Sequence, residues 1–159
     1  MRHETWKLPY FTEQQMRQLS ARFPDAVFSP VDGKEWRLEL SHLFMTDNPN
    51  EYVSCPFLTD KGCGCTAEEK SFDCAVWPLR LCRRRDGSLH IMLTGCCPVV
   101  CDKPLEDVRQ FVRQELQQRI CAYAAEHPAV IRESLPCLID VIQLEDAPDN
   151  LFSNDWKSF

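Results

Sequence analysis

Long apolar segments are absent from this 159-residue chain. No hydrophobic run approaches the roughly 20 residues that a membrane-spanning helix needs, so we expect no membrane partner. The first residues, MRHETWKLPYF, contain neither an apolar h-region nor a small-residue cleavage site. This predicts that the chain carries no secretory signal and is cytoplasmic. Hydrophobic residues make up 44% and charged residues 26%, which is ordinary globular usage, and the length predicts one domain spanning residues 1–159.

An excess of positive charge is also absent, since the formal net charge is −6. General nucleic-acid binding depends on neutralising phosphates with lysine and arginine, so we expect no nucleic-acid partner. The chain has no G-x-S-x-G, no H-E-x-x-H and no phosphate-binding glycine loop. Hydrolase and nucleotide-binding functions therefore lack their usual motifs, and the sequence leaves open whether the protein is an enzyme.

Cysteine is missing from the first fifty residues and concentrated after them. Eight of the ten cysteines lie between Cys55 and Cys101. Thiols in the cytosol are kept reduced, so disulfides do not account for this number. Metal or redox chemistry becomes the leading interpretation.

Glycine and proline flank several of these cysteines. The runs CPFL, GCGC and GCCP place them next to Cys55, Cys63 and Cys97, and such neighbours allow a loop to fold back around an ion. Thiolates in fours hold a zinc ion tetrahedrally or hold an iron–sulfur cluster. The chain has no adjacent pair of C-x-x-C knuckles. The spacing therefore predicts a metal site without identifying the metal.

Periodicity predicts helices and short strands around the cysteine region. Thr12 followed by Gln15 forms a capping-box pattern for a helix over residues 11–23. The other expected elements are a strand over residues 34–40, a hairpin of residues 79–85 and 88–94 around Asp86–Gly87, a helix that begins near Pro104, and a second helix over residues 135–144. The predicted fold class is α+β. It is a small single domain in which cysteine-rich metal-binding loops, about residues 55–101, and a short β-hairpin pack against α-helices, with a helical C-terminal part at about 104–144.

Three short motifs follow one another in the cysteine region: CPFL at 55–58, GC at 62–63, and CAVWP at 74–78. In this order they resemble the YkgJ-like (CxxCxxCC-type) family of zinc- or iron-chelating domains. In that family a basic–proline pair lies between the second and third motifs, where this chain has KS at 70–71. The resemblance implies a cysteine-ligated metal with ligands at Cys55, Cys63 and Cys74. Cys65 is either an alternative to Cys63 or a buried small hydrophobic residue.

The fourth ligand departs from the family pattern. The name-giving cysteine cluster normally precedes the CPFL segment, whereas no cysteine precedes Cys55 here. The run GCCPVVC at 95–101 is the natural donor. Within it we favour Cys97, because its Cys-Pro pairing resembles ferredoxin-type ligands, with Cys96 and Cys101 as alternatives.

The resemblance also bears on the cofactor. Flagellin lysine methylases resemble this family in a cysteine domain that holds an iron–sulfur cluster, so we favour an iron–sulfur cluster of the [4Fe–4S] type over Zn²⁺. Cations near the sulfurs tune the potential of a cluster, and Arg80, Arg83, Arg84 and Arg85 could serve this role. The alternative interpretation is that these arginines form a solvated hairpin end.

The remaining cysteines and histidines give weaker signals. Cys82 is either a reactive thiol beside arginines or a strand residue that packs. We expect Cys121 and Cys137 in the core, and His90 as a structural residue rather than a metal ligand. The carboxylates at 68–69 are expected to form a loop face.

Three functions are compatible with these observations. The first is a metal-binding protein that uses an iron–sulfur cluster or a single ion for redox chemistry, sensing or metal handling. The second is an interaction module with structural zinc and a protein partner. The third is a thiol redox protein that needs no metal. We favour the first.

Overall fold

The structure is a computed structural model that describes residues 8–31, 34–43, 48, 54–95, 100 and 102–144. The chain divides into two compact units, Met1–Ala75 and Val76–Phe159. Both units contain helices and strands, which confirms the predicted α+β class. That the chain is one domain stays a prediction. Within the described ranges, no helix has the length and apolar character needed to cross a bilayer.

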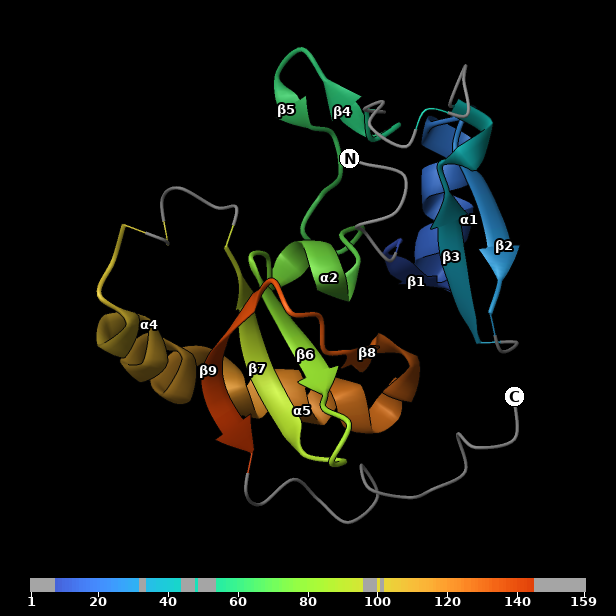
Figure 1. Ribbon diagram of the computed structural model, residues 1–159. Helices are drawn as coiled ribbons and strands as arrows, with labels where there is room; N and C mark the ends of the chain where they lie inside the picture. The colour runs from blue at the N-terminus through green and yellow to red at the C-terminus, as the bar shows by residue number, and fades with distance from the viewer. Residues whose placement is uncertain are drawn as a thin grey trace. The chain divides into compact units, whose positions relative to one another are not determined.

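Unit 1 is a small sheet with one long helix and several short elements (Figure 1). In chain order these are β1 (Tyr10–Thr12), α1 (Glu13–Arg22), β2 (Val27–Pro30), β3 (Glu35–Glu39), the 3₁₀ turn η1 (Ser41–Leu43), β4 (Leu58–Thr59), β5 (Gly62–Cys63) and α2 (Phe72–Ala75). The first three strands form an antiparallel sheet in the order β1-β3-β2.

Helix α1 begins where the capping box predicted. The hydroxyl of Thr12 accepts the backbone N–H of Gln15, and the side chain of Gln15 accepts the backbone N–H of Thr12. These two bonds satisfy amides that a helix start leaves without partners. The helix buries Leu19 and ends at Arg22. The predicted strand over 34–40 is confirmed as β3, the middle strand of the sheet.

The core of unit 1 joins this sheet and helix to the start of the cysteine region. Its buried side chains are Phe11, Leu19, Ala26, Leu38, Leu40 and Phe57. Cys55 and Cys65 are partly buried against the same cluster. The cysteine loops are therefore attached to a hydrophobic core and not merely to one another.

Unit 2 is a four-stranded sheet with helices across one face (Figure 1). Its elements are β6 (Leu79–Arg83), β7 (Leu89–Thr94), α4 (Leu105–Phe111), the π-helical segment η2 (Val112–Leu116), α5 (Gln117–Glu126), the 3₁₀ turn η3 (Pro128–Val130), β8 (Arg132–Glu133) and β9 (Leu138–Leu144). The strand order is β8-β6-β7-β9, in which only the β6–β8 pair is parallel.

The predicted hairpin forms the centre of this sheet. Strands β6 and β7 pair in register from Leu79 opposite Leu93 to Arg83 opposite Leu89. Gly87 in the connecting turn has φ +90°, which only glycine adopts readily. All six residues of β7 are buried, so this strand is the spine of unit 2.

The predicted helix that begins near Pro104 is confirmed, and the one over residues 135–144 is wrong. Pro104 is the N-cap residue of α4, and helical backbone continues through η2 and α5 to Glu126. Residues 135–137 precede β9, which pairs antiparallel with β7 and carries a β-bulge near Val141. The bulge makes two successive residues, Val141 and Ile142, face the core. The regular alternation of apolar and polar residues that marks a strand is therefore interrupted, and the spacing of apolar residues resembles that of a helix.

Candidate metal centre

The CPFL motif is fixed to unit 1 by its phenylalanine. Phe57 is 3% exposed, and its ring centroid lies 5.2 Å from that of Phe23, 5.8 Å from Phe11 and 6.3 Å from Phe28. Two of these contacts are edge-to-face, an arrangement that aromatic quadrupoles favour. Burial of Phe57 therefore holds Cys55, two residues earlier, at the edge of the core.

Cys63 ends the second strand of a short antiparallel hairpin. Strands β4 and β5 pair Leu58 with Cys63 and Thr59 with Gly62. Gly62 has φ +101°, and its carbonyl accepts the hydroxyl of Thr59 at 2.8 Å. The left-handed backbone at Gly62 reverses the chain, so that Cys63 lies opposite Leu58 of the CPFL motif.

Gly64 sits in a space with no room for a side chain. A Cβ at this position would lie 3.0 Å from the Phe23 ring and 3.3 Å from the carbonyl of Phe57. The amide of Gly64 donates to that same carbonyl at 2.8 Å. Close packing on both sides thus explains glycine between Cys63 and Cys65.

Helix α1 holds the loop after Cys65 through two side chains. The amide nitrogen of Gln15 donates to the carbonyls of Glu68 and Lys70, both at 2.9 Å. Arg22 donates to the carbonyl of Gly64 at 3.0 Å and forms an ion pair with Glu69. The capping glutamine and the last residue of one helix therefore position the backbone of the cysteine loop.

Glu69 closes a turn with the reciprocal hydrogen bonds of a capping box, a pattern that the sequence contains but that our sequence interpretation missed. The backbone N–H of Thr66 donates to the Glu69 carboxylate at 2.8 Å, and the N–H of Glu69 donates to the Thr66 hydroxyl at 3.3 Å. Glu69 is only 7% exposed, so the expected loop face at 68–69 is wrong for this residue. Its hydrogen bond with Arg22 is the main reason that its pKa is lowered. The pattern T-x-x-E was the available signal.

Cys74 belongs to the short helix α2. The buried hydroxyl of Ser71 accepts the backbone N–H of Cys74 at 3.2 Å. Cys74 keeps solvent-exposed surface, yet desolvation by the surrounding protein raises the pKa of its thiol, while a hydrogen bond with Ser71 acts in the opposite direction. The charges of Asp73 and Cys63 also raise this pKa.

The other thiols of unit 1 act on one another electrostatically. Desolvation raises the pKa of Cys55, a hydrogen bond from the amide of Phe57 opposes this, and the charges of Cys74 and Cys63 raise it further. Desolvation also raises the pKa of Cys65 to about 12, helped by the charge of Cys63 and by a hydrogen bond with its thiol. The four thiols thus share one electrostatic environment, in which ionising one opposes ionising the next.

The structure brings Cys55, Cys63 and Cys74 into this common environment together with Cys65. Among the residues that it describes, no three His, Cys, Asp or Glu side chains are arranged to hold one metal ion. Cys97 and its alternatives Cys96 and Cys101 lie outside the described residues. The ligand set therefore stays a prediction. The residues fit a metal held by thiolates, because the sulfurs of Cys55 and Cys74 accept hydrogen bonds from the Phe57 amide and the Ser71 hydroxyl, and such donors stabilise metal-bound sulfur.

The described cysteines of unit 2 are dispersed. Cys82 is fully buried in β6, which confirms that it packs within a strand. Cys121 is half-buried in α5, where desolvation raises its pKa. Cys137 was expected in the core at a helix start, and this is wrong: it is exposed in the turn before β9.

Two cations of unit 1 itself act on its described thiols, and the role expected of Arg80, Arg83, Arg84 and Arg85 stays a prediction. Lys70 lowers the pKa of Cys74, and Arg22 interacts with the charge of Cys65. Arg83 donates to the carbonyl of Gly87 within the hairpin. Closeness in the sequence does not reveal the cation near Cys65, because Arg22 lies on a separate helix about 40 residues earlier in the chain.

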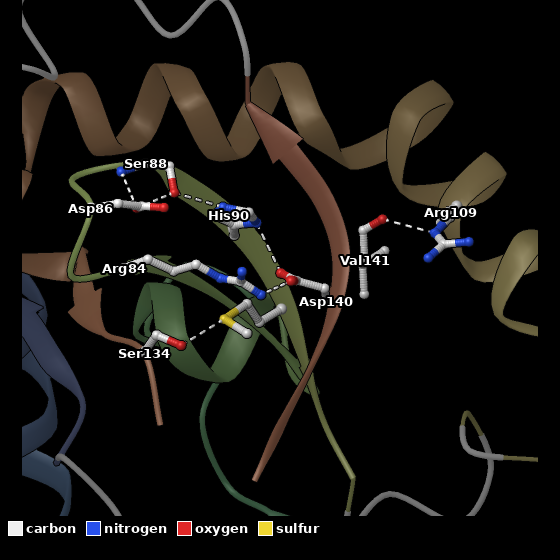
Figure 2. A network of polar contacts seen from close by, with 9 residues as sticks. Arg84, Asp86, Ser88, His90, Arg109, Ser134, Asp140 and Val141 are labelled. Atoms are coloured by element: carbon white, nitrogen blue, oxygen red, sulfur yellow. Dashed lines mark hydrogen bonds and ion pairs between the residues drawn. The ribbon is translucent and has the colours of Figure 1, made fainter. Parts of the chain in front are cut away.

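A second polar cluster lies on the sheet of unit 2 (Figure 2). The imidazole of His90 lies between the hydroxyl of Ser88, 2.8 Å from Nε2, and the carboxylate of Asp140, 2.9 Å from Nδ1. Arg84 pairs with the other oxygen of Asp140, and Asp86 accepts the Ser88 hydroxyl at 2.6 Å. Desolvation lowers the pKa of His90, the charge of Arg84 lowers it further, and Asp86 opposes this.

These residue types match a Ser-His-Asp triad, but their geometry does not. The Ser88 hydroxyl donates to Asp86 instead of to His90. Nδ1 of His90 and the near oxygen of Asp140 are close without being aligned for a hydrogen bond. The amides of Gly87 and Ser88 are bonded to the Arg84 carbonyl and to Asp86, so neither can stabilise an oxyanion. The cluster joins the hairpin to β9 and agrees with a structural role for His90.

Comparisons with protein-family models, curated proteins and solved structures found no match to this chain. The resemblance to the YkgJ-like family therefore stays a prediction, based on the three cysteine motifs alone.

Proposed function

We propose that the chain binds a metal through cysteine thiolates, with Cys55, Cys63 and Cys74 of unit 1 as ligands and Cys97, which lies outside the described residues, as the fourth. The observation that carries this proposal is the shared electrostatic environment of four free thiols of unit 1, two of which, Cys55 and Cys65, pack against its core. A bound iron–sulfur cluster, which we favour, would supply one-electron transfer, whereas Zn²⁺ would supply a structural cross-link.

The hydrogen bonds to the thiols support this proposal. The amide of Phe57 and the hydroxyl of Ser71 lower the pKa values of Cys55 and Cys74 against the larger effect of desolvation. Such donors stabilise sulfur that carries negative charge. Because no three of the described side chains form a coordination shell, metal binding requires the thiols to turn toward the ion.

Metal binding should release protons and strengthen with pH. Desolvation raises the pKa of Cys55 and of Cys74, so at neutral pH both are protonated thiols in the metal-free protein. A metal binds the thiolate, and each ligand must lose its proton. We expect the apparent affinity for Zn²⁺, measured by competition with a coloured chelator, to rise steadily from pH 6 to pH 8. A flat affinity over this range would contradict thiol ligation.

Elemental analysis together with a visible absorption spectrum tests the proposal and identifies the metal. The protein is purified without oxygen and without an affinity metal. Several irons per chain with broad visible absorption would identify a cluster, whereas one zinc per chain without colour would identify a structural ion and support an interaction module with a protein partner. A chain that contains neither metal, and takes up neither when it is offered anaerobically, would refute the proposal.

Serine variants test the ligands. We expect Cys55→Ser, Cys63→Ser and Cys74→Ser each to lose most of the bound metal, and Cys97→Ser to behave alike. Two cysteines of unit 2 are matched controls: Cys121 is half-buried like Cys55, and Cys137 is exposed like Cys63. Equal metal content in ligand and control variants would refute the assignment.

A further inference from the structure

The thiols of Cys63 and Cys65 are direct neighbours. A side-chain hydrogen bond joins them, and only Gly64 separates them in the chain. Cys63 is exposed, whereas Cys65 is half-buried against the core of unit 1. One thiol of the pair is thus open to reagents in solution and the other is held behind it.

The backbone between the two thiols is held on both sides. The amide of Gly64 donates to the carbonyl of Phe57 at 2.8 Å, and its own carbonyl accepts Arg22 at 3.0 Å. A Cβ at Gly64 would lie only 3.0 Å from the Phe23 ring, so a side chain there would require the ring to shift. These contacts hold the backbone of the residue that joins the two cysteines.

We propose that Cys63 and Cys65 form a reversible disulfide, with a small disulfide such as oxidised glutathione as the oxidant. The exposed sulfur of Cys63 attacks one sulfur of the oxidant, and one glutathione leaves as a thiol. The neighbouring sulfur of Cys65 then attacks the sulfur of Cys63 and displaces the second glutathione. The two protein thiols are oxidised, the oxidant is reduced to two thiols, and the two protons pass to these leaving groups.

This disulfide would be of the labile kind. A bridge across one intervening residue removes little chain entropy from the unfolded state, because the stabilisation grows with the length of the closed loop. Exposed or strained disulfides are reduced more easily than structural ones. Cellular thiols can therefore reverse the reaction, as a switch requires.

The consequence for the metal rests on the proposed function. Cys63 is a proposed ligand, and a sulfur in a disulfide has no thiolate to offer. Oxidation of the pair would release the metal, and bound metal would protect the pair from oxidation. The proposed site is thereby sensitive to the thiol–disulfide balance of its surroundings.

Peptide mapping tests the disulfide in metal-free protein. The reduced full-length chain is incubated with oxidised glutathione, its free thiols are blocked with N-ethylmaleimide, and the protein is digested with trypsin. Cleavage after Lys61 and Lys70 yields peptide 62–70, which contains Cys63 and Cys65 and no other cysteine. We expect this peptide without maleimide and lighter by two hydrogen atoms. Reduction with dithiothreitol before blocking should restore two maleimide groups.

Two variants show which step each sulfur performs. Cys65→Ser should stop at a stable mixed disulfide, so that peptide 62–70 carries one glutathione. Cys63→Ser should react more slowly than Cys65→Ser, because its remaining thiol is half-buried. Recovery of the wild-type peptide with both cysteines alkylated, or joined to the peptide of Cys55 or Cys74, would overturn the inference.

Metal analysis separates this inference from the proposed function. A metal-binding protein that forms no disulfide at 63 and 65 would refute the inference alone. A protein that forms the disulfide but binds no metal would refute the proposed function alone. If both hold, treatment with oxidised glutathione should lower the metal content of the wild-type chain, and reduction with dithiothreitol should allow the metal to bind again.

Discussion

The described cysteines of the two units differ in arrangement more than in burial. In unit 1, Cys55, Cys63, Cys65 and Cys74 lie on short loops and elements within 20 residues of one another and influence each other's ionisation. In unit 2, Cys82 belongs to a strand, Cys121 to a helix and Cys137 to a turn. Desolvation alone raises the pKa of Cys121, and no other thiol contributes. A high cysteine count therefore indicates chemistry only where turns bring the thiols together.

The polar networks of the two units differ in the same way. In unit 1, Gln15 and Arg22 bond to loop carbonyls, so their function is to shape the backbone that carries the thiols. In unit 2, Arg84 forms an ion pair with Asp140, and His90 lies between Ser88 and Asp140, so these residues connect the hairpin to β9. The first network positions reactive groups, and the second stabilises a sheet.

Replacing Phe57 should give the largest effect. Phe57→Ala removes the ring at the centre of the aromatic cluster and should cost about 3–5 kcal/mol of unfolding free energy. Chemical denaturation measures this loss, and the metal content should fall with it. The neighbouring Leu58 is 59% exposed, so Leu58→Ala should change stability by about 0.5 kcal/mol or less. Equal effects would contradict the role of Phe57 as the anchor of the CPFL loop.

Two glycine substitutions compare backbone packing in the units. Gly64→Ala would press a methyl group against Phe23 and the carbonyl of Phe57 and should cost about 1–3 kcal/mol, as overpacking does. At Gly95 a Cβ would meet nothing closer than 3.8 Å, so Gly95→Ala should be close to neutral. Thermal unfolding of both variants measures the difference. If Gly64→Ala is as stable as Gly95→Ala, the tight fit at Gly64 is wrong.

Removing Arg22 should have a smaller effect on stability and a specific effect on the cysteine loop. Arg22→Gln loses the ion pair with Glu69 and leaves the Gly64 carbonyl without its side-chain donor. We expect faster amide hydrogen exchange in residues 64–70. Arg17→Gln is the control, since Arg17 pairs with Glu13 on the exposed surface of the same helix. Unchanged hydrogen exchange in residues 64–70 of Arg22→Gln would contradict the conclusion that Arg22 holds this loop.

Mild acid should weaken unit 2 slightly through His90. The folded state lowers the pKa of this imidazole below its ordinary value of 6.5, chiefly by desolvation. The unfolded chain therefore binds a proton more readily, so stability is complete above about pH 6.5 and declines as the pH falls toward the folded pKa.

Thermal unfolding at pH 7.5 and pH 5.5 checks this sign. His90→Gln should show a smaller difference in melting temperature between the two values of pH than the wild type does. If His90→Gln keeps the full difference in melting temperature between pH 7.5 and pH 5.5, another group causes the loss of stability in acid.

Local patterns were the part of the fold that could be predicted. The capping box at Thr12 and Gln15, the Asp86–Gly87 turn and the helix after Pro104 depend on neighbours within four residues, and each was confirmed. The helix over 135–144 failed because the β-bulge near Val141, formed against β7, removed the alternation that marks a strand. Pairing between distant strands cannot be read from a single segment.

Local sequence patterns account for the cysteine-rich character of residues 55–101, the turns at their glycines and the helix starts at Thr12 and Pro104. These features follow from residue type and from short-range backbone geometry. The folded structure was needed to show which thiols of unit 1 shift one another's pKa. It was also needed to show that Arg22 and Gln15 hold their loop and that Cys137 is exposed. Electrostatics and hydrogen bonds act through space, so partners far apart in the chain appear only when the core brings their elements together.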